Sequence, residues 1–405
     1  MGEMRTVMKH GRNRRRTRRR RSNLRASNWF PFLMLFLSVL GVLSAAGLVV
    51  FVGLPKVLPL IGVSYRAPFM PTPSPSPTPV PTPTPNPMDS FNPAEAQSEV
   101  IFDGSTSYTW FGDPYFYKGT LLLSAGKVVD RNATMTNLFF YYPDEGRTAE
   151  LLPYKLKNSH FMFARFNDDW IVYLDAKLDG GGYITAIDRR DTNAQPIIIK
   201  EVFAGQPALM LDGNYLAWTE RTGSRMDKLF VCDLMSRETA AVQLFNNNCY
   251  GESKPSLRNG LLLWADLDDS AVTSLTSVIC SVALNGSPSI KTYRPGTFVH
   301  DPESDGEYTA WLDGNHGPNT SLYFCKDFGT PVKIDTGVVD FGLSENFIAY
   351  SKDSSIYVYM LKDRKTYRIT PETEQAQLLG VSDGKVIWMD VTTRERDIVK
   401  FAPIP

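Results

Sequence analysis

Hydrophobic and polar residues alternate along residues 98–405 in a pattern that recurs several times. Each copy begins with a turn containing Gly, Asp or Asn and continues as a short β-branched run that ends in Trp or Tyr. A polar loop and a second apolar strand follow. The six clear copies are NDDWIVYLD, DGNYLAWTE, NGLLLWAD, DGEYTAWLD, ENFIAYSK and DGKVIWMD. A period of two, many aromatic residues and no amphipathic helix pattern predict an all-β fold.

The aromatic residues of these copies recur at a nearly constant spacing. They are Tyr173, Trp218, Trp264, Trp311, Tyr350 and Trp388, and the intervals between them are 45, 46, 47, 39 and 38 residues. A degenerate copy, KGTLLLSA, places Leu123 50 residues before Tyr173. A period of about 44 residues indicates a repeated supersecondary unit, and three or four short strands per unit match one blade of a β-propeller.

The length of the repeat region sets the number of blades. Residues 98–405 accommodate seven units of about 44 residues, with six or eight blades as alternatives because the first copy is degenerate. The last copy stops at DIVKFAPIP, after its third strand, whereas the region opens with an unpartnered strand, SEVIFD. We therefore expect this N-terminal strand to complete the last blade and close the ring.

These repeats carry a family resemblance. DGKVIW, DGNYLAW and IYVYMLKDRKTYRIT resemble the repeats of TolB-like β-propellers, a WD40-like class found in secreted bacterial proteins. The resemblance covers nearly all of residues 98–405 and implies the fold and a general capacity for binding. It does not extend to a Tol–Pal role, because an anchor and a stalk stand where TolB has an α/β domain. The repeat motif indicates the fold of the blades and does not indicate a catalytic activity or a ligand.

Three segments of different composition precede the repeats. Residues 1–28 carry ten Arg and Lys9 against Glu3 alone, residues 29–53 are almost wholly apolar, and residues 54–97 include PTPSPSPTPVPTPTPNP. A helix over the 23 residues from Phe30 to Val52 spans about 34 Å, slightly more than the roughly 30 Å hydrocarbon core of a bilayer. The positive-inside bias then places residues 1–28 in the cytoplasm and the repeats outside.

We therefore predict a signal-anchor helix over residues 29–53. A cleaved signal peptide is the alternative, since Ser44 and Ala46 offer the small residues of a cleavage site. Residues 54–97 are expected to be a disordered linker whose proline-rich part extends as polyproline II. This part resembles the Pro/Thr stalks of bacterial surface proteins. The predicted location is the cell membrane of a Gram-positive bacterium, with the propeller outside.

The distribution of charged residues, histidines and cysteines indicates which partners and which kinds of site to expect. The net charge of zero hides a charge of +10 on residues 1–28 and −10 on the remainder. An acidic ectodomain makes nucleic acid an unsuitable partner, because phosphate-binding surfaces need clustered Lys and Arg. Four scattered histidines and four scattered cysteines give no metal-site spacing and no disulfide framework. We predict no metal, no cofactor and no disulfide. The cysteines are Cys232, Cys249, Cys280 and Cys325.

The sequence contains no catalytic motif such as GxSxG, HExxH or a P-loop. The favoured function is therefore a non-enzymatic module that binds a protein, peptide or glycan partner at the cell envelope. The alternative is a carbohydrate-active enzyme that uses a pair of loop carboxylates. The candidate carboxylates are Asp266, Asp268 and Asp269 of the DLDD sequence, or Asp301 with Glu303. The sequence does not indicate the oligomeric state.

Five of the six copies place an acid two residues after the aromatic residue. These acids are Asp175, Glu220, Asp266, Asp313 and Asp390. Period two puts acid and ring on one face of the strand, at the end that meets the loop between the second and third strands. Either these carboxylates cap backbone N–H groups of the loops, or they form a binding rim for a cationic partner or calcium. The six aromatic residues are expected to pack between blades rather than to stack on sugars.

Overall fold

The computed structural model describes residues 30–48, 87–100, 110–129, 132–151, 160–221, 227–236, 243–247, 253–268, 276–286, 289–315, 317–393 and 398–405. The chain divides into two units, Met1–Thr84 and Pro85–Pro405. In the first unit the described residues form one helix, α1 (Phe30–Leu48). Within the described ranges, no helix combines the length and apolar character that a membrane span requires. The predicted tail (1–28), residues 29 and 49–53 of the predicted span, and linker residues 54–86 lie outside them.

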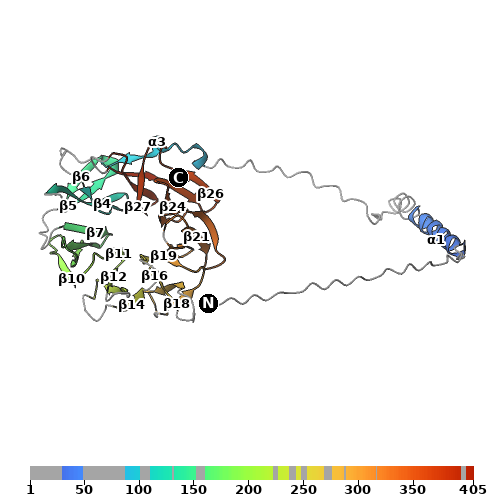
Figure 1. The fold of residues 1–405 in the computed structure, drawn as a ribbon, viewed down its shortest axis with the longest axis horizontal. Coiled ribbons are helices and arrows are strands. Elements are labelled where there is room, and N and C mark those ends of the chain that lie inside the picture. Colours follow the sequence, from blue (N-terminus) through green and yellow to red (C-terminus); the bar gives the residue numbers. More distant parts are fainter. Residues whose placement is uncertain are drawn as a thin grey trace, which may run out of the picture. The chain divides into compact units, whose positions relative to one another are not determined.

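The described residues of the second unit form seven antiparallel sheets arranged as a ring (Figure 1). Blade 1 contains β2 (Trp110–Phe111), β3 (Tyr115–Tyr117), β4 (Thr120–Val129), β5 (Asn132–Tyr142) and β6 (Arg147–Glu150), with the short helix η4 (Pro143–Glu145) before β6. Blade 2 contains β7 (His160–Phe166), β8 (Trp170–Ala176), β9 (Gly182–Asp188) and β10 (Ile197–Val202). Blade 3 contains β11 (Leu209–Asp212), β12 (Tyr215–Arg221), β13 (Asp227–Asp233) and β14 (Gln243–Asn247).

The remaining blades follow the same order. Blade 4 contains β15 (Ser256–Arg258), β16 (Leu261–Leu267), β17 (Ser277–Ala283) and β18 (Lys291–Tyr293). Blade 5 contains β19 (Val299–Ser304), β20 (Tyr308–Asp313), β21 (Ser321–Lys326) and β22 (Val332–Thr336). Blade 6 contains β23 (Asp340–Leu343), β24 (Phe347–Lys352), β25 (Ser355–Met360) and β26 (Lys365–Arg368). Blade 7 contains β27 (Ala376–Ser382), β28 (Lys385–Asp390), β29 (Ile398–Pro403) and β1 (Ser98–Glu99).

The N-terminal strand closes the ring, as the sequence predicts. β1 pairs with β29 through Ser98 with Phe401 and Glu99 with Lys400, and the Val100 N–H donates to the Val399 carbonyl at 2.9 Å. The last blade therefore combines three C-terminal strands with one N-terminal strand. The seven-bladed all-β propeller is confirmed.

The first strand of each blade lies at the inside of the ring and contacts the first strand of the next blade, from β3 through β27 and back to β3. The sequence pattern did not reveal these inner strands, because several are interrupted. The pairing register shifts within β7, β19 and β27 at bulges, and bulges disturb the period-two pattern. The aromatic residues instead mark the second strand of six blades.

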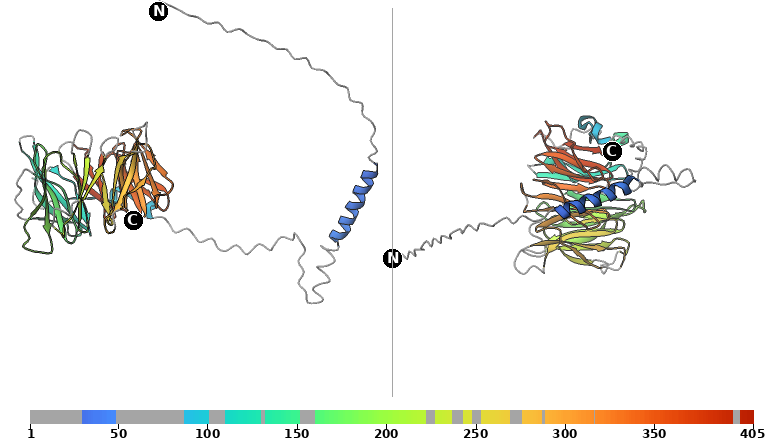
Figure 2. Two further views of the ribbon diagram at one scale, coloured as in Figure 1. Left: turned by 90° about the horizontal axis from the view of Figure 1, so that it is seen from below. Right: turned by 90° about the vertical axis from the view of Figure 1, so that its right-hand side faces the viewer.

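Alternating strand direction creates two loop faces, which the side view in Figure 2 shows above and below the strands. Loops that join first to second strands and third to fourth strands lie on one face, which we call the turn face. Loops that join second to third strands, and the connections between blades, lie on the other, which we call the connection face. The predicted binding rim belongs to the connection face.

The core lies between blades. Each of seven hydrophobic clusters combines buried residues of two neighbouring blades, and together they cover all seven blade junctions. At the junction of blades 2 and 3, for example, Trp170 and Leu174 pack with Leu209 and Trp218. A ring as large as tryptophan buries about 150 to 250 Å², so one aromatic residue per blade supplies much of each junction.

The second unit begins before the predicted boundary at Ser98. A segment that we call the strap, with η3 (Pro87–Ser90) and α3 (Pro93–Ala96), packs across blades 6 and 7. Met88 is 2% exposed and joins the cluster that contains Phe347 and Trp388. The Tyr367 hydroxyl donates to Asp89 Oδ1 at 2.9 Å. The end of the predicted linker is therefore part of the propeller.

The strap gives a testable prediction. Replacing Met88 with Ala leaves a cavity between blades 6 and 7 and should lower the free energy of unfolding by about 2 to 5 kcal/mol. Chemical denaturation of the full-length chain measures this change. The matched control is Met235→Ala, because Met235 is 51% exposed and its truncation should shift the midpoint little. Equal midpoints for wild type and Met88→Ala would show that the strap does not stabilise the ring.

Candidate functional site

The six repeat aromatics are buried. Tyr173, Trp218, Trp264, Trp311, Tyr350 and Trp388 have exposed fractions of 0 to 3%. Several of their polar edges are also satisfied, since Trp388 Nε1 donates to Glu374 Oε1 at 2.6 Å and the Tyr350 hydroxyl donates to Asp335 Oδ2 at 3.0 Å. A sugar-stacking ladder needs exposed ring faces, so this arrangement favours packing between blades.

The acids of the predicted rim are engaged by their own surroundings. Glu220 Oε1 accepts from Trp218 Nε1 at 2.8 Å. Asp266 Oδ1 accepts from the Leu267 N–H at 2.9 Å, and Asp313 Oδ1 accepts from the Phe298 N–H at 2.8 Å. The bond to Asp313 ties the connection from blade 4 to the second strand of blade 5. These contacts favour the capping interpretation.

The other two rim acids are the most buried of the five. Asp175 is 5% exposed and lies near His160. Asp390 Oδ1 accepts from the Thr392 N–H at 3.0 Å, and its Oδ2 lies 2.7 Å from Lys400 Nζ. Burial opposes the charged form of Asp390, but the hydrogen bonds from Lys400 and Thr392 outweigh it and lower the pKa of this carboxyl.

The rim therefore does not present five free charges to a ligand. Within the described residues, no three His, Cys, Asp or Glu side chains come together as a metal ion would require. Of the DLDD carboxylates, Asp268 receives two hydrogen bonds from Arg294, at 2.9 and 3.1 Å, and Asp269 lies outside the described residues. An arginine held in this bidentate way fixes Asp268 as a structural group.

The second predicted carboxylate pair, Asp301 with Glu303, belongs to an inner strand. Both lie on β19, and three charged residues of blades 4 and 6 join them in what we call the inner-strand charge cluster: Lys254, Arg258, Asp301, Glu303 and Asp340. Lys254 Nζ lies 3.0 Å from Asp340 Oδ2, and its backbone N–H donates to Asp301 Oδ1 at 2.5 Å. Asp301 has a positive φ of 49°, at the bulge of β19.

Glu303 links blades 5 and 6. Its Oε2 accepts from the Leu343 N–H at 2.7 Å, while Arg258 Nη1 donates to the Leu343 carbonyl at 3.0 Å. Both backbone groups of Leu343 are thus held by side chains of other blades. Burial raises the pKa of Glu303 to about 7, and the neighbouring Asp340 adds to the rise, against the Leu343 N–H, Arg258 and Lys254. A carboxyl of this kind can exchange a proton at neutral pH.

Sequence reasoning identified two members of this cluster and missed three. Asp301 and Glu303 stood out as a local acidic pair. Lys254, Arg258 and Asp340 come from other blades, and no local pattern connects residues so far apart in the chain. The signal that could have connected them is their location on or next to inner strands. Bulges disturb the alternating pattern by which such strands are recognised in a sequence.

The described cysteines lie on the third strands of blades 3, 4 and 5. Cys232, Cys280 and Cys325 carry free thiols and are buried, while Cys249 lies outside the described residues. Burial raises the pKa of the Cys232 and Cys280 thiols to about 11. Since the thiolate is the reactive form, these two groups are unsuited to nucleophilic chemistry.

The connection face carries two exposed apolar side chains on adjacent loops. Leu178, in the loop between β8 and β9, is 54% exposed, and Phe203, in the connection from β10 to β11, is 80% exposed. The two loops are joined because the Gly181 N–H donates to the Gly205 carbonyl at 2.7 Å and Gln206 Nε2 donates to the Lys177 carbonyl at 3.2 Å. We call Leu178 and Phe203 with these loops the apolar loop pair.

A glycine makes this close approach possible. Gly181 has φ +77°, and a Cβ there would lie 2.6 Å from the Val202 carbonyl oxygen. Any larger residue would separate the loops. The two loops of the apolar loop pair are therefore held together, and an exposed phenylalanine on them is suited to enter a pocket of a partner.

Comparison with known proteins supports the fold alone. No protein-family model and no curated protein matches the sequence. Among solved structures, the β-propeller domain of the Trilobed protease from Pyrococcus furiosus matches with a TM-score of 0.56 and 11% identity, over 73% of this chain and 96% of that one. The Pyrococcus horikoshii acylaminoacyl peptidase matches with a TM-score of 0.52 and 10% identity, over 70% of this chain and 49% of that one.

TolB from Acinetobacter baumannii is also among the matches, with a TM-score of 0.38 and 14% identity over 66% of this chain and 59% of that one. At such identities, the two matches with TM-scores above 0.5 support the architecture of the fold and no activity. The Trilobed protease propeller is described as having an open velcro topology, whereas here β1 pairs with β29. The chain is a seven-bladed β-propeller with a closed last blade.

The inner-strand charge cluster predicts a pH effect on stability. A carboxyl whose pKa rises from 4.5 to about 7 on folding destabilises the folded state progressively as the pH rises between these values. Glu303→Gln is neutral at every pH and keeps an oxygen for the Leu343 N–H. We expect little change in unfolding free energy at pH 5 and a gain on the order of 2 kcal/mol at pH 8.

Thermal unfolding at both pH values measures this effect. Glu372→Gln, at an exposed position in the connection between β26 and β27, is the matched control for the substitution itself. An equal change in stability at pH 5 and pH 8 for Glu303→Gln would contradict the raised pKa.

Proposed function

We propose that the chain is a single-pass, membrane-anchored protein of a bacterial cell envelope whose propeller, outside the membrane, binds a protein partner through its connection face. The observation that carries the proposal is the apolar loop pair. Scattered single apolar residues are ordinary on protein surfaces. Two apolar side chains on loops that the backbone holds together are a stronger indication of a contact surface, because their exposure is built into the fold.

A third residue supports the same face. Val339, in the connection from β22 to β23, is 72% exposed, so exposed apolar side chains occur on two separate blade connections. The connection face is also where loop variation leaves the sheets unchanged. The exposed apolar side chains of this face, rather than its acids, carry the proposal.

The anchoring part of the proposal has separate support. The apolar side chains of α1 from Leu35 to Leu43 are at least half exposed, and the apolar stretch of the sequence continues beyond this helix to residue 53. Eleven basic residues precede it, and a proline-rich stretch follows it. An anchor joined to the propeller through a proline-rich stretch is suited to a binding module outside the membrane.

Site-specific photo-crosslinking in cells tests the binding face. A photoreactive residue at position 203 of the full-length chain should yield one discrete protein adduct. The same residue at position 290 is the matched control, because Ile290 is 54% exposed but lies in the loop between β17 and β18, on the turn face. Phe203→Asp should weaken binding of the identified partner at least tenfold with unchanged melting, because the ring is 80% exposed. Adducts at position 290 only, or full binding by Phe203→Asp, would overturn the proposal.

A second candidate function is favoured by one observation, the neutral-range pKa of Glu303 beside Asp301. It is a carbohydrate-active enzyme in which these two carboxylates act as acid and base. Incubating the full-length chain with a panel of oligosaccharides tests it. Cleavage that Glu303→Gln abolishes, while the variant remains folded at the assay temperature, would establish this function. Absence of cleavage, or cleavage that survives in the variant, would exclude these residues.

A further inference from the structure

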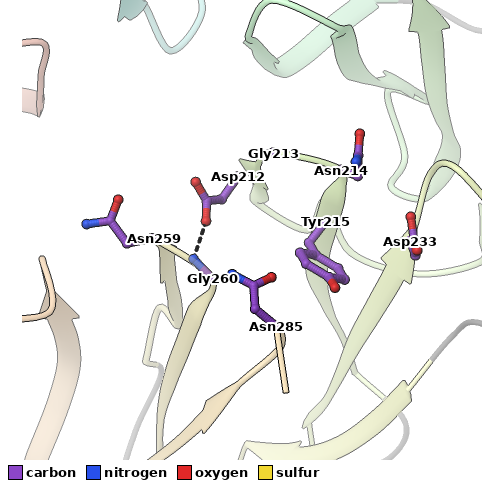
Figure 3. A pocket seen from close by; sticks show the side chains of 8 residues that line it. All are labelled: Asp212, Gly213, Asn214, Tyr215, Asp233, Asn259, Gly260 and Asn285. Carbon is purple, nitrogen blue, oxygen red and sulfur yellow. Dashed lines mark hydrogen bonds between the residues drawn. The ribbon is translucent and has the colours of Figure 1, made fainter. Parts of the chain in front are cut away.

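The turn face contains a hollow of about 480 Å³ at the junction of blades 3 and 4. The turns β11–β12 and β15–β16 and the loops after β13 and β17 form it (Figure 3). Its lining consists of Asp212, Gly213, Asn214, Tyr215, Asp233, Asn259, Gly260 and Asn285. The volume lies within the roughly 300 to 1,000 Å³ of small-molecule sites, and the hollow is on the face opposite to the apolar loop pair.

The lining is chemically distinctive. It contains two carboxylates, three carboxamides and one tyrosine, and no Lys or Arg. Without a cation it is unsuited to phosphate, sulfate or a carboxylate ligand. Without aliphatic side chains it offers little to an apolar ligand, since such ligands bind in hydrophobic pockets. The composition points to a neutral molecule rich in hydroxyl groups, which both donate and accept hydrogen bonds.

Part of the polar lining is fixed by contacts between blades. Asp212 Oδ2 accepts from the Gly260 N–H at 2.5 Å, a contact that Figure 3 shows as a dashed line. Asn214 Oδ1 accepts from Trp170 Nε1 at 3.0 Å, and Asn259 Nδ2 donates to the Asp305 carbonyl at 2.8 Å. Asn214 and Asn259 are thereby held toward blades 2 and 5, and Asp212 is the side chain that these contacts fix between blades 3 and 4.

Asn285 is the most available group. Its amide makes no hydrogen bond to any described residue, and it reaches toward Gly260, where a Cβ would lie 2.2 Å from Asn285 Nδ2. Gly260 also has φ +68°, a backbone conformation that favours glycine. The absence of a side chain at Gly260 leaves room for the Asn285 amide. The Tyr215 hydroxyl donates to the Leu284 carbonyl at 3.2 Å, which holds the aromatic ring within the hollow.

We propose that this hollow binds a neutral sugar residue of a glycan. Carboxylate and carboxamide groups held at fixed positions can bond neighbouring hydroxyls of a sugar, and a tyrosine ring can pack against its C–H face. The two carboxylates disfavour acidic sugars by repulsion. This site is independent of the partner proposed for the connection face.

Ligand-observed NMR with the full-length chain, in buffer free of glycosides, tests the assignment. The probes are chitobiose, cellobiose, glucuronic acid and Ca²⁺. At least one of the two neutral disaccharides should bind saturably in the millimolar range, glucuronic acid should bind at least tenfold more weakly, and Ca²⁺ should not compete. Asn285→Ala should reduce disaccharide binding at least tenfold with unchanged melting.

The matched control is Asn193→Ala. Asn193 is an exposed asparagine in the corresponding loop of blade 2, on the same face and outside the hollow, so its replacement should leave binding unchanged. Three outcomes would overturn the proposal: no saturable binding of either disaccharide, binding that Asn285→Ala leaves intact, or Ca²⁺ binding that Asn285→Ala removes.

Discussion

Apolar contact between neighbouring blades is the interaction on which the rest of this structure depends. A single four-stranded sheet has two faces to bury, and each blade does so only by packing against the blade on either side. The seven clusters therefore form a closed ring. Trp218 packs at the junction of blades 2 and 3, and Trp388 packs in the same way at the junction of blades 6 and 7. A closed ring leaves no uncovered outer sheet face. The polar residues at the two loop faces are not needed for this packing and can take other roles.

The sequence predicted the architecture because the strongest packing residue of each blade recurs at one position. Large rings at intervals of 38 to 47 residues identified the second strand, and the unpartnered SEVIFD segment predicted the closure. The inner strands were not predicted, because bulges such as that between His300 and Glu303 break the alternation. The strap was assigned to the linker, since its proline-rich neighbour masked the two apolar residues, Met88 and Phe91, that pack on the ring.

The candidate sites were less accessible to sequence reasoning, for a physical reason. Asp and Asn residues in the turns of blades 3 and 4 indicated hairpins, which is correct, but their convergence around one hollow depends on how two blades are placed side by side. Likewise, Arg258 reaches the Leu343 carbonyl across blades. The repeated acids show a different case: their regular pattern was compatible with caps or with a binding rim, and contacts such as that of Asp313 with the Phe298 N–H favour caps. Repetition favours structural roles, and function is more evident where the repeats differ.

Closure of the last blade by β1 also constrains the order in which the protein can mature. Ser98 finds its partner Phe401 only after almost the entire propeller has been synthesised. Contacts this distant in sequence form slowly, because the loop must close before the contact contributes. Until then the growing chain exposes unpaired edges of unfinished blades, which are prone to association with other chains. A product truncated before Ile398 would retain six blades and lose β29, the strand that receives β1. The last strand of the propeller to be synthesised thus decides whether the first strand of the domain has a partner.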